Sequence, residues 1–256
     1  FCVPVDSTMC LVYTSGSTGK PKGVIQTRKT WLYHMQQRKR RGNPTTDVRF
    51  SYSPLSHSSG IRHVYKSFYR GGRVGFHRGE METLLESVFS LRPVALSGTP
   101  RFWDFLMDQF HVIHQNNIKK NKQLVQPQGD RAVLENSYEE LRQSLGGRVT
   151  QTSVGGAIPS ASTRKFMQDC FGFSTGDGFG ITECGPVLND GIPCHGVDVS
   201  IQYLYACKLT YWQSILLDIP TLGYSTQSNP PRGELCIKSP TLMVRNHFHV
   251  IHCCDK

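Results

Sequence analysis

The distribution of apolar and polar residues divides most of the chain into short strands and helices. Apolar runs at residues 9–13 and 24–25 flank a stretch of small polar residues, which predicts a strand, a loop and a second strand. Further along, apolar residues recur at helical spacing over residues 84–91, between two short β-prone runs. Because such alternation of strands and helices is typical of one class, we predict an α/β fold.

The same pattern predicts the bounds of individual elements. Strands are expected near residues 49–52, 73–76, 94–96 and 149–154, and helices near residues 30–40, 61–69, 80–91 and 160–171. A further helix opens at Pro100 and carries four large apolar side chains at helical spacing, Trp103, Leu106, Met107 and Phe110. This stripe indicates a core face rather than a cofactor contact. Residues 115–130 are mostly polar, and we expect them to form a mobile surface excursion.

The polar stretch between the first two strands has the composition of a phosphate-binding loop. Gly16, Gly19 and Gly23 permit positive φ and close approach of a ligand, so several backbone N–H groups can face one concavity. Hydroxyls and the side chains of Lys20 and Lys22 add donors that suit a polyphosphate. The stretch is not a Walker A loop, because too few residues separate its glycines and a proline follows the first lysine. A flexible Gly/Ser linker is the alternative, but linkers seldom place two lysines and a proline between β-prone runs.

Charge and cysteine content limit the classes of protein. The 256 residues carry a formal charge of +10, which fits nucleic acid, an acidic membrane surface or a nucleotide. Much of the excess lies at residues 28–41, where a solvated helix end explains it more readily than a DNA contact. Nine cysteines without a repeated spacing predict reduced thiols. No apolar run approaches the length of a bilayer span and no leader is recognisable, so we expect a cytoplasmic protein without stable membrane insertion.

Two further segments carry candidate chemistry. Residues 155–157 end a predicted strand with small residues just before a helix, where open α/β sheets hold ligands. Residues 176–185 form a second predicted glycine-rich loop, with two carboxylates and an aromatic ring that suit base stacking and a cation. His111 and His114 have one-turn spacing but no Cys or carboxylate partner at ligand distance, so no metal site is predicted there.

These segments together resemble one enzyme family. Residues 13–24 are similar, nearly letter for letter, to the signature of the adenylate-forming (AMP-binding) enzymes, which include acyl-CoA synthetases, luciferases, peptide-synthetase adenylation domains and carboxylic acid reductases. Residues 179–183 resemble the family's Tyr-Gly-x-Thr-Glu motif, and residues 155–157 its Gly-Gly-Ala strand end. Residues 55–57 and 100–104 are most similar to carboxylic acid reductases. The resemblance implies part of the family's large N-terminal α/β domain, with mixed β-sheets flanked by helices and the start of a small β-barrel subdomain.

The resemblance also implies roles for individual residues. The residues implied to hold ATP are Thr14, Ser15, Gly16, Ser17, Thr18, Gly19, Lys20, Gly23, Gly155, Gly156, Ala157, Asp177, Gly178, Phe179, Gly180, Ile181 and Thr182. Among them, Lys20 is implied to bind the β- and γ-phosphates, Thr182 the α-phosphate, and Phe179 to flank adenine. Glu183 is implied to ligate Mg²⁺. His57 matches the position where the family places an aromatic ring or a His beside the carboxylate, and an ordinary hydrogen-bonding role is the alternative.

The resemblance covers the chain unevenly. It assigns residues 1–199 to a partial AMP-binding domain and residues 217–243 to strands of the β-barrel subdomain. Residues 200–216 and 244–256 match nothing in the family, and we interpret them as translated intron or an incorrect gene end. The family's ribose-binding Asp, hinge and C-terminal domain with its catalytic Lys are not found after residue 243. We therefore expect a truncated part of an enzyme, which binds ATP weakly and catalyses little by itself.

The predicted function is ATP- and Mg²⁺-dependent activation of a carboxylic acid, fatty or aryl, to an acyl adenylate. The acyl group is expected to pass to the thiol of CoA or of a carrier-protein phosphopantetheine. One alternative is a catalytically inactive nucleotide-binding remnant. A more distant alternative is a basic nucleic-acid-binding protein, which is disfavoured because no helix-turn-helix pattern or aromatic-basic interleaving is found, so nucleic acid is not an expected partner.

Overall fold

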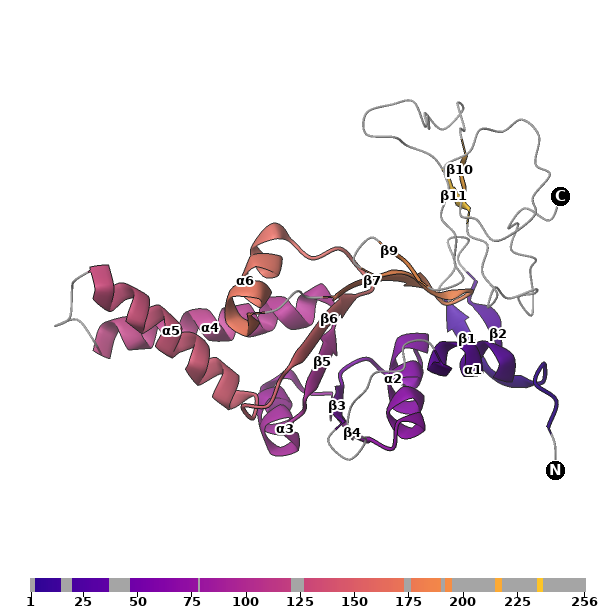
Figure 1. Cartoon of the computed structure of the whole chain (residues 1–256), viewed down its shortest axis with the longest axis horizontal. Coiled ribbons are helices and arrows are strands. Elements are labelled where there is room, and N and C mark those ends of the chain that lie inside the picture. The colour runs from indigo at the N-terminus through magenta and orange to yellow at the C-terminus, as the bar shows by residue number, and fades with distance from the viewer. Residues whose placement is uncertain are drawn as a thin grey trace. The chain divides into compact units, whose positions relative to one another are not determined.

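The computed structural model describes residues 3–14, 20–36, 47–77, 79–120, 127–172, 176–189, 192–194, 215–217 and 234–236. These residues belong to two compact units, one of residues 40–177 and the other of residues 1–39 together with 178–256 (Figure 1). One strand, β7 (Gly176–Ile181), begins in the first of these units and ends in the second.

The unit of residues 40–177 is built on a parallel sheet. Its strands lie in the order β4 (Arg73–Phe76), β3 (Val48–Ser51), β5 (Ala95–Gly98) and β6 (Gln151–Gly155). On the central strand β3, Phe50 pairs with Gly75 on one side and with Leu96 on the other. Because all these strands are parallel, their carboxyl ends meet at one edge, which is the edge where open α/β sheets hold ligands.

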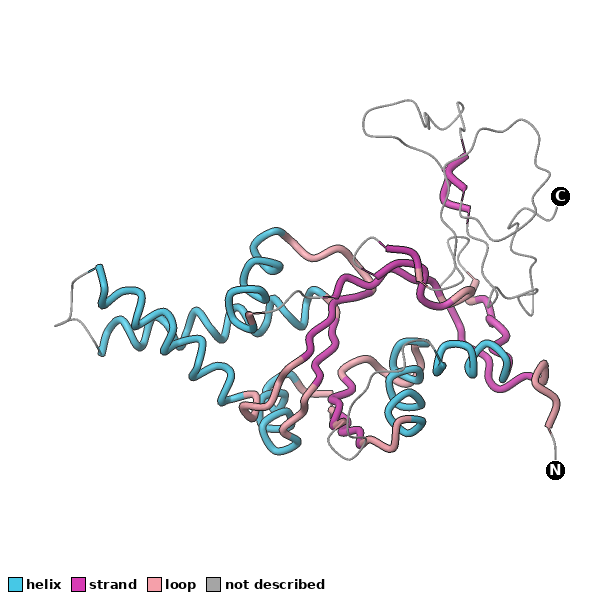
Figure 2. The backbone as a smooth tube through the Cα atoms, in the orientation of Figure 1, coloured by secondary structure: helices cyan, strands magenta, loops and turns pink. Residues whose placement is uncertain are grey.

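Helices follow each strand of this sheet. They are α2 (Ser58–Tyr69), the short 3-10 helix η2 (Met81–Thr83) with α3 (Leu84–Leu91), α4 (Pro100–Lys120), α5 (Pro127–Ser144) and α6 (Ala161–Phe171). The two longest, α4 and α5, lie side by side, and α6 packs on both (Figure 2). Among the described helices, none combines the length and hydropathy that a bilayer span requires.

The core of this unit lies where the helices cover the sheet. Its fully or almost fully buried members include Phe50, Leu84, Val88, Leu96, Trp103, Leu106, Leu141, Leu145, Phe166 and Met167. The predicted stripe on α4 is confirmed as a core face, with Met107 at its partly buried margin. Apolar burial on this scale is the main force that holds the helices on the sheet.

The other unit is built from antiparallel strands. Its elements are β1 (Thr8–Thr14), β2 (Lys22–Thr27), α1 (Arg28–Gln36), β8 (Gly185–Asn189), β9 (Ile192–Pro193), β10 (Ile215–Leu217) and β11 (Glu234–Cys236). The strands pair as a β1–β2 hairpin, as β7 with β8 and β8 with β9, and as β10 with β11. The structure thus confirms a mixture of parallel and antiparallel sheet within an α/β fold.

Two of the predicted elements are wrong. Residues 115–130 are not simply a surface excursion, because α4 continues to Lys120 and α5 begins at Pro127. The polar positions that obscured these helices are partly internal: the buried amide of Asn117 donates to the hydroxyl of Ser137 (3.2 Å) and to Glu140 (3.0 Å) on α5. The second error concerns residues 176–185, which form the strand β7, a turn and the start of β8 rather than a loop.

Candidate nucleotide site

The first glycine-rich motif connects the two strands of the β1–β2 hairpin. Thr14 at the end of β1 pairs with Lys22 at the start of β2, and the buried Val12 and Val24 anchor the two strands beneath. Lys20 is exposed at the entrance to β2. The predicted ligands at residues 15–19, Ser15, Gly16, Ser17, Thr18 and Gly19, lie outside the described residues. The two predicted strands are therefore confirmed, while the loop between them and its contact with phosphate stay predictions.

The motif of residues 179–183 covers the end of β7 and the start of the turn that follows it. Phe179 is exposed by 43%, while Thr182 and Glu183 are partly buried in the turn between β7 and β8. Gly180 sits at a bulge of this pair, where a Cβ would meet the carbonyl oxygen of Gly185. Any larger residue would push the two strands apart, which explains the glycine there.

One hydrogen bond joins the β1–β2 hairpin to the turn between β7 and β8. The side-chain amide of Gln26 on β2 donates through Nε2 to the carbonyl oxygen of Thr182, at 2.8 Å. Gln26 is only 4% exposed, so this bond satisfies a buried amide. The hairpin that carries Lys20 is thereby tied directly to the turn that carries Glu183. Sequence reasoning missed Gln26, because a single polar residue within a strand gives no signal of its partner.

A second contact fixes the same turn. Gly185, the first residue of β8, has φ +75°, and a Cβ at this position would collide with the imidazole of His34 on α1. His34 is 8% exposed and packs against the glycine. The close approach therefore requires glycine both for its backbone conformation and for space.

The Gly-Gly-Ala segment lies at the carboxyl end of the parallel sheet. Gly155 ends β6, and Gly156 follows with φ +85°. Among the described residues, the one atom near a Cβ at Gly156 is the methyl carbon of Thr99, at an ordinary 3.8 Å, so conformation rather than crowding requires glycine here. Gly156 and Ala157 are both exposed. Their position agrees with the predicted ligand-facing edge of the sheet.

His57 has a structural role that the sequence left open. It is the N-cap of α2, and its Nδ1 accepts from the backbone N–H of Ser59 at 3.2 Å. The hydroxyl of Ser59 lies 2.8 Å from the same nitrogen. The ring is exposed and belongs to the unit of residues 40–177. Capping accounts for the residue without a substrate, and its role beside the carboxylate stays a prediction.

The same helix carries a strongly perturbed histidine. Burial, and to a smaller extent the neighbouring charges of Arg62, Arg49 and Lys66, lower the pKa of His63 on α2 to about 4. The imidazole is therefore neutral at pH 7. No sequence pattern marked His63, because its neighbours come from both α2 and β3.

Among the described side chains of the two glycine-rich segments, Glu183 offers Mg²⁺ a carboxylate. Within the described ranges, no group of three or more His, Cys, Asp or Glu side chains is placed to hold a metal. Mg²⁺ usually binds through one or two carboxylates together with substrate phosphates and water. The carboxylate of Glu183 fits that pattern, whereas the side chain of Asp177 is not among those described.

Comparison with known proteins decides the family. The model of the AMP-binding enzyme family matches residues 2–245. The chain belongs to the AMP-binding enzymes. A carboxylic acid reductase of Mycobacterium marinum is 31% identical over 242 residues, covering 93% of this chain and 19% of the relative. Fatty acyl-CoA synthetase A of Dictyostelium discoideum is 30% identical over 256 residues, covering 92% of this chain and 37% of the relative.

Solved structures of AMP-binding enzymes agree with this fold. The A-PCP didomain of the carboxylic acid reductase from Segniliparus rugosus, in complex with AMP, superposes with a TM-score of 0.73 at 28% identity, covering 95% of this chain and 31% of that one. The adenylation domain of the Mycobacterium chelonae carboxylate reductase superposes with a TM-score of 0.70 at 27% identity, covering 95% of this chain and 36% of that one. The predicted family is confirmed, and the chain spans well under half the length of these relatives.

Proposed function

We propose that this chain is part of an enzyme that activates a carboxylic acid with ATP and Mg²⁺, releasing pyrophosphate and forming an acyl adenylate. Membership of the AMP-binding family supports the nucleotide. The observation that carries the proposal is the hydrogen bond from Gln26 to the carbonyl of Thr182. This bond connects the β1–β2 hairpin, which carries the predicted phosphate-binding residues, to the Thr182–Glu183 turn within one unit. A likeness to an adenylation domain solved with AMP and a co-purified carboxylic acid supports the same chemistry.

Each segment has a task in that reaction. Lys20, exposed beside the hairpin loop, neutralises charge on the departing pyrophosphate, and the hydroxyl of Thr182 hydrogen-bonds the α-phosphate. Phe179 offers an exposed ring on which adenine can stack. The carboxylate of Glu183 would hold Mg²⁺, which when bound would supply further neutralisation of phosphate charge. Since little covalent chemistry falls to the protein, alignment of carboxylate and α-phosphorus is its main contribution.

The acyl group is proposed to pass to a thiol. The relatives include both acyl-CoA synthetases and carboxylic acid reductases, and one similar solved structure joins its adenylation domain to a carrier domain. CoA and a carrier phosphopantetheine are therefore the two candidate acceptors. A fatty or aryl acid is the candidate substrate.

Acid-dependent exchange of labelled pyrophosphate into ATP tests the proposal. The protein is incubated with MgATP, labelled pyrophosphate and a panel of fatty and aryl acids. The proposal is supported if incorporation of label into ATP depends on the acid and falls by about a hundredfold in Thr182→Ala. Lys165→Ala, which alters an exposed ion pair on α6, serves as the control and should retain exchange. Nucleotide binding without exchange for any acid, together with binding of an acyl-adenylate mimic no tighter than AMP, indicates a non-catalytic remnant instead.

A further inference from the structure

Two consecutive residues of α4 hold both sides of the turn at residues 155–157. Before the turn, the indole Nε1 of Trp103 donates to the carbonyl oxygen of Ser153 on β6, at 3.2 Å. After the turn, the hydroxyl of Thr163 on α6 donates to Oδ1 of Asp104, at 2.6 Å. The side chains of Trp103 and Thr163 are both fully buried. The two flanks of the turn are therefore fixed to the same point of one helix.

The contact with Asp104 is part of the N-cap of α6. Ser160 accepts a hydrogen bond from the backbone N–H of Thr163 at 3.0 Å, and the hydroxyls of these two residues lie 2.7 Å apart. Because the Thr163 hydroxyl directs its own proton to Asp104, it can accept a hydrogen bond from the hydroxyl of Ser160. A carboxylate acceptor makes the Thr163 bond charge-assisted and short. Asp104 therefore sets the orientation of the cap from which α6 starts.

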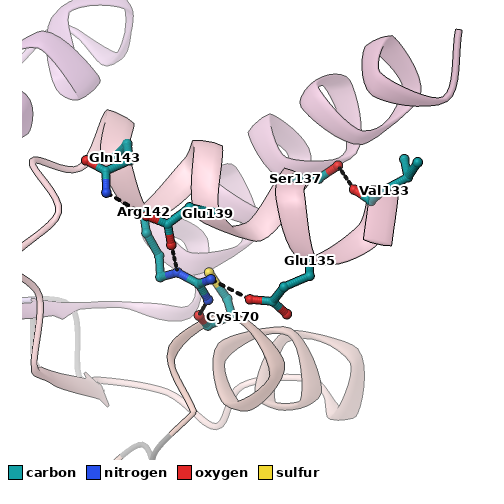
Figure 3. Close-up of polar contacts among 7 residues, drawn as sticks. All are labelled: Val133, Glu135, Ser137, Glu139, Arg142, Gln143 and Cys170. Carbon is teal, nitrogen blue, oxygen red and sulfur yellow. Dashed lines mark hydrogen bonds and ion pairs between the residues drawn. The ribbon is translucent and has the colours of Figure 1, made fainter. Parts of the chain in front are cut away.

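Apolar packing alone does not define this orientation. The inner face of α6, including Phe166 and Met167, is buried, but apolar contacts are not directional and leave rotation and sliding of the helix weakly constrained. Directional contacts at the two ends supply the constraint: Asp104 at the start, and Arg142 at the end, where it donates to the carbonyl oxygen of Cys170 at 2.6 Å (Figure 3). Of these two contacts, only that of Asp104 is next to the turn.

We propose that Asp104 is a positioning residue for the nucleotide and acyl group. It acts through Thr163 to hold the start of α6, while Trp103 holds the end of β6, and together they keep Gly156 at its φ of +85°. This inference rests on the proposed function and on the resemblance to the AMP-binding family, which implies that Gly155 and Gly156 line the space between nucleotide and acyl group. Asp104 itself touches neither.

Three variants separate positioning from general stability. Asp104→Ala removes the acceptor of the Thr163 hydroxyl, whereas Asp104→Asn keeps an acceptor oxygen at the same place. Arg142→Ala is the matched control, because it removes a comparable directional contact from the far end of the same helix. The first readout is amide hydrogen exchange at residues 155–157, measured in mild buffer where circular dichroism shows each variant folded.

We expect loss of the Asp104 contact to change amide hydrogen exchange only near residues 155–157. Exchange at residues 155–157 should accelerate about tenfold in Asp104→Ala and stay near the unsubstituted rate in Asp104→Asn and Arg142→Ala. If Asp104→Ala does not fold, Thr163→Val, which removes the donor with little change of volume, provides the same test. Unchanged exchange in the variant that lacks the bond, or equal acceleration in Arg142→Ala, would overturn the inference.

Nucleotide affinity supplies the second readout. The dissociation constant for AMP should rise about tenfold in Asp104→Ala and return to the original value in Asp104→Asn. If the unsubstituted protein binds no AMP, the proposed function fails, while hydrogen exchange still judges the positioning role. AMP affinity that is unchanged although exchange accelerates contradicts the link between the turn and the nucleotide.

Discussion

Replacement of Arg142 by alanine tests how α5 holds the end of α6. The guanidinium donates through Nη1 to the carbonyl oxygen of Cys170 (2.6 Å), through Nε to Glu139 (2.9 Å) and through Nη2 to Glu135 (2.5 Å), as Figure 3 shows. The two carboxylates orient the guanidinium, so that an N–H of Nη1 points at the helix end. Carbonyls at a helix C-terminus lack intrahelical partners and favour a cation.

The expected loss of stability follows from how far each partner of Arg142 is exposed to solvent. The side chains of Glu135 and Glu139 are 66% and 50% exposed, so their ion pairs with Arg142 contribute well under about 1 kcal/mol each. The Arg142 side chain is 27% exposed, and its bond to the partly buried carbonyl of Cys170 contributes about 2 kcal/mol. We therefore expect Arg142→Ala to lower the free energy of unfolding by about 2 to 3 kcal/mol.

Urea unfolding at pH 7 measures this loss. The urea concentration at the midpoint of unfolding should fall. The slope of the unfolding free energy against urea concentration should stay unchanged, because the surface that unfolding exposes stays the same. Lys165→Ala is the control, since it breaks only an exposed i,i+4 pair with Asp169 and should cost less than about 0.5 kcal/mol. An Arg142→Ala loss no larger than that of the control would refute the argument.

Further expectations concern buried groups in both units and the choice of ligand. Because the pKa of His63 is about 4 when folded and near 6.5 when unfolded, the unfolded state binds the proton first as pH falls. Stability should therefore be complete above pH 6.5 and decline towards pH 4, and His63→Leu should flatten that slope in urea titrations at successive pH values. Gln26→Ala should destabilise its unit by about 1 kcal/mol, because the carbonyl of Thr182 loses its donor; an unchanged urea midpoint counts against the contact. Gly156→Ala should cost about 1 to 2 kcal/mol from its positive φ, and a neutral effect in the same assay contradicts the conformation. Electrophoretic mobility of labelled duplex DNA should be unaffected by the protein at 150 mM salt, whereas a salt-sensitive shift would support nucleic-acid binding.

The elements that the sequence predicts best are those with unambiguous local signals. Ser160 and Gly172 bound α6 as its N-cap and left-handed C-cap, as expected from their residue types. Helix α5 was missed because its inner face consists of single apolar residues such as Tyr138 and Leu141, spaced among charged ones. Its partner α4 becomes polar just where the two helices meet through Asn117.

The site motifs were predictable from composition, but their mutual placement was not. Glycine, hydroxyl and lysine content marked the β1–β2 hairpin, and the order Phe179, Thr182, Glu183 marked the second segment. The bond from Gln26 to the Thr182 carbonyl joins residues far apart in the sequence, and no local pattern encodes such a pairing. The same holds for Asp104 and Thr163, which only the packing of α6 on α4 brings together.

Equilibrium binding of a stable acyl-adenylate mimic tests the central proposal most directly, because it does not require turnover by this chain. In such a mimic a sulfamate replaces the reactive phosphate between adenosine and a fatty or aryl acyl group. Isothermal titration calorimetry should show that the mimic binds at least about a hundredfold more tightly than AMP, since it occupies both the nucleotide and the acyl positions. Thr182→Ala should remove most of that gain, while Lys165→Ala should preserve it. Binding of the mimic no tighter than AMP would contradict a site built for an acyl adenylate.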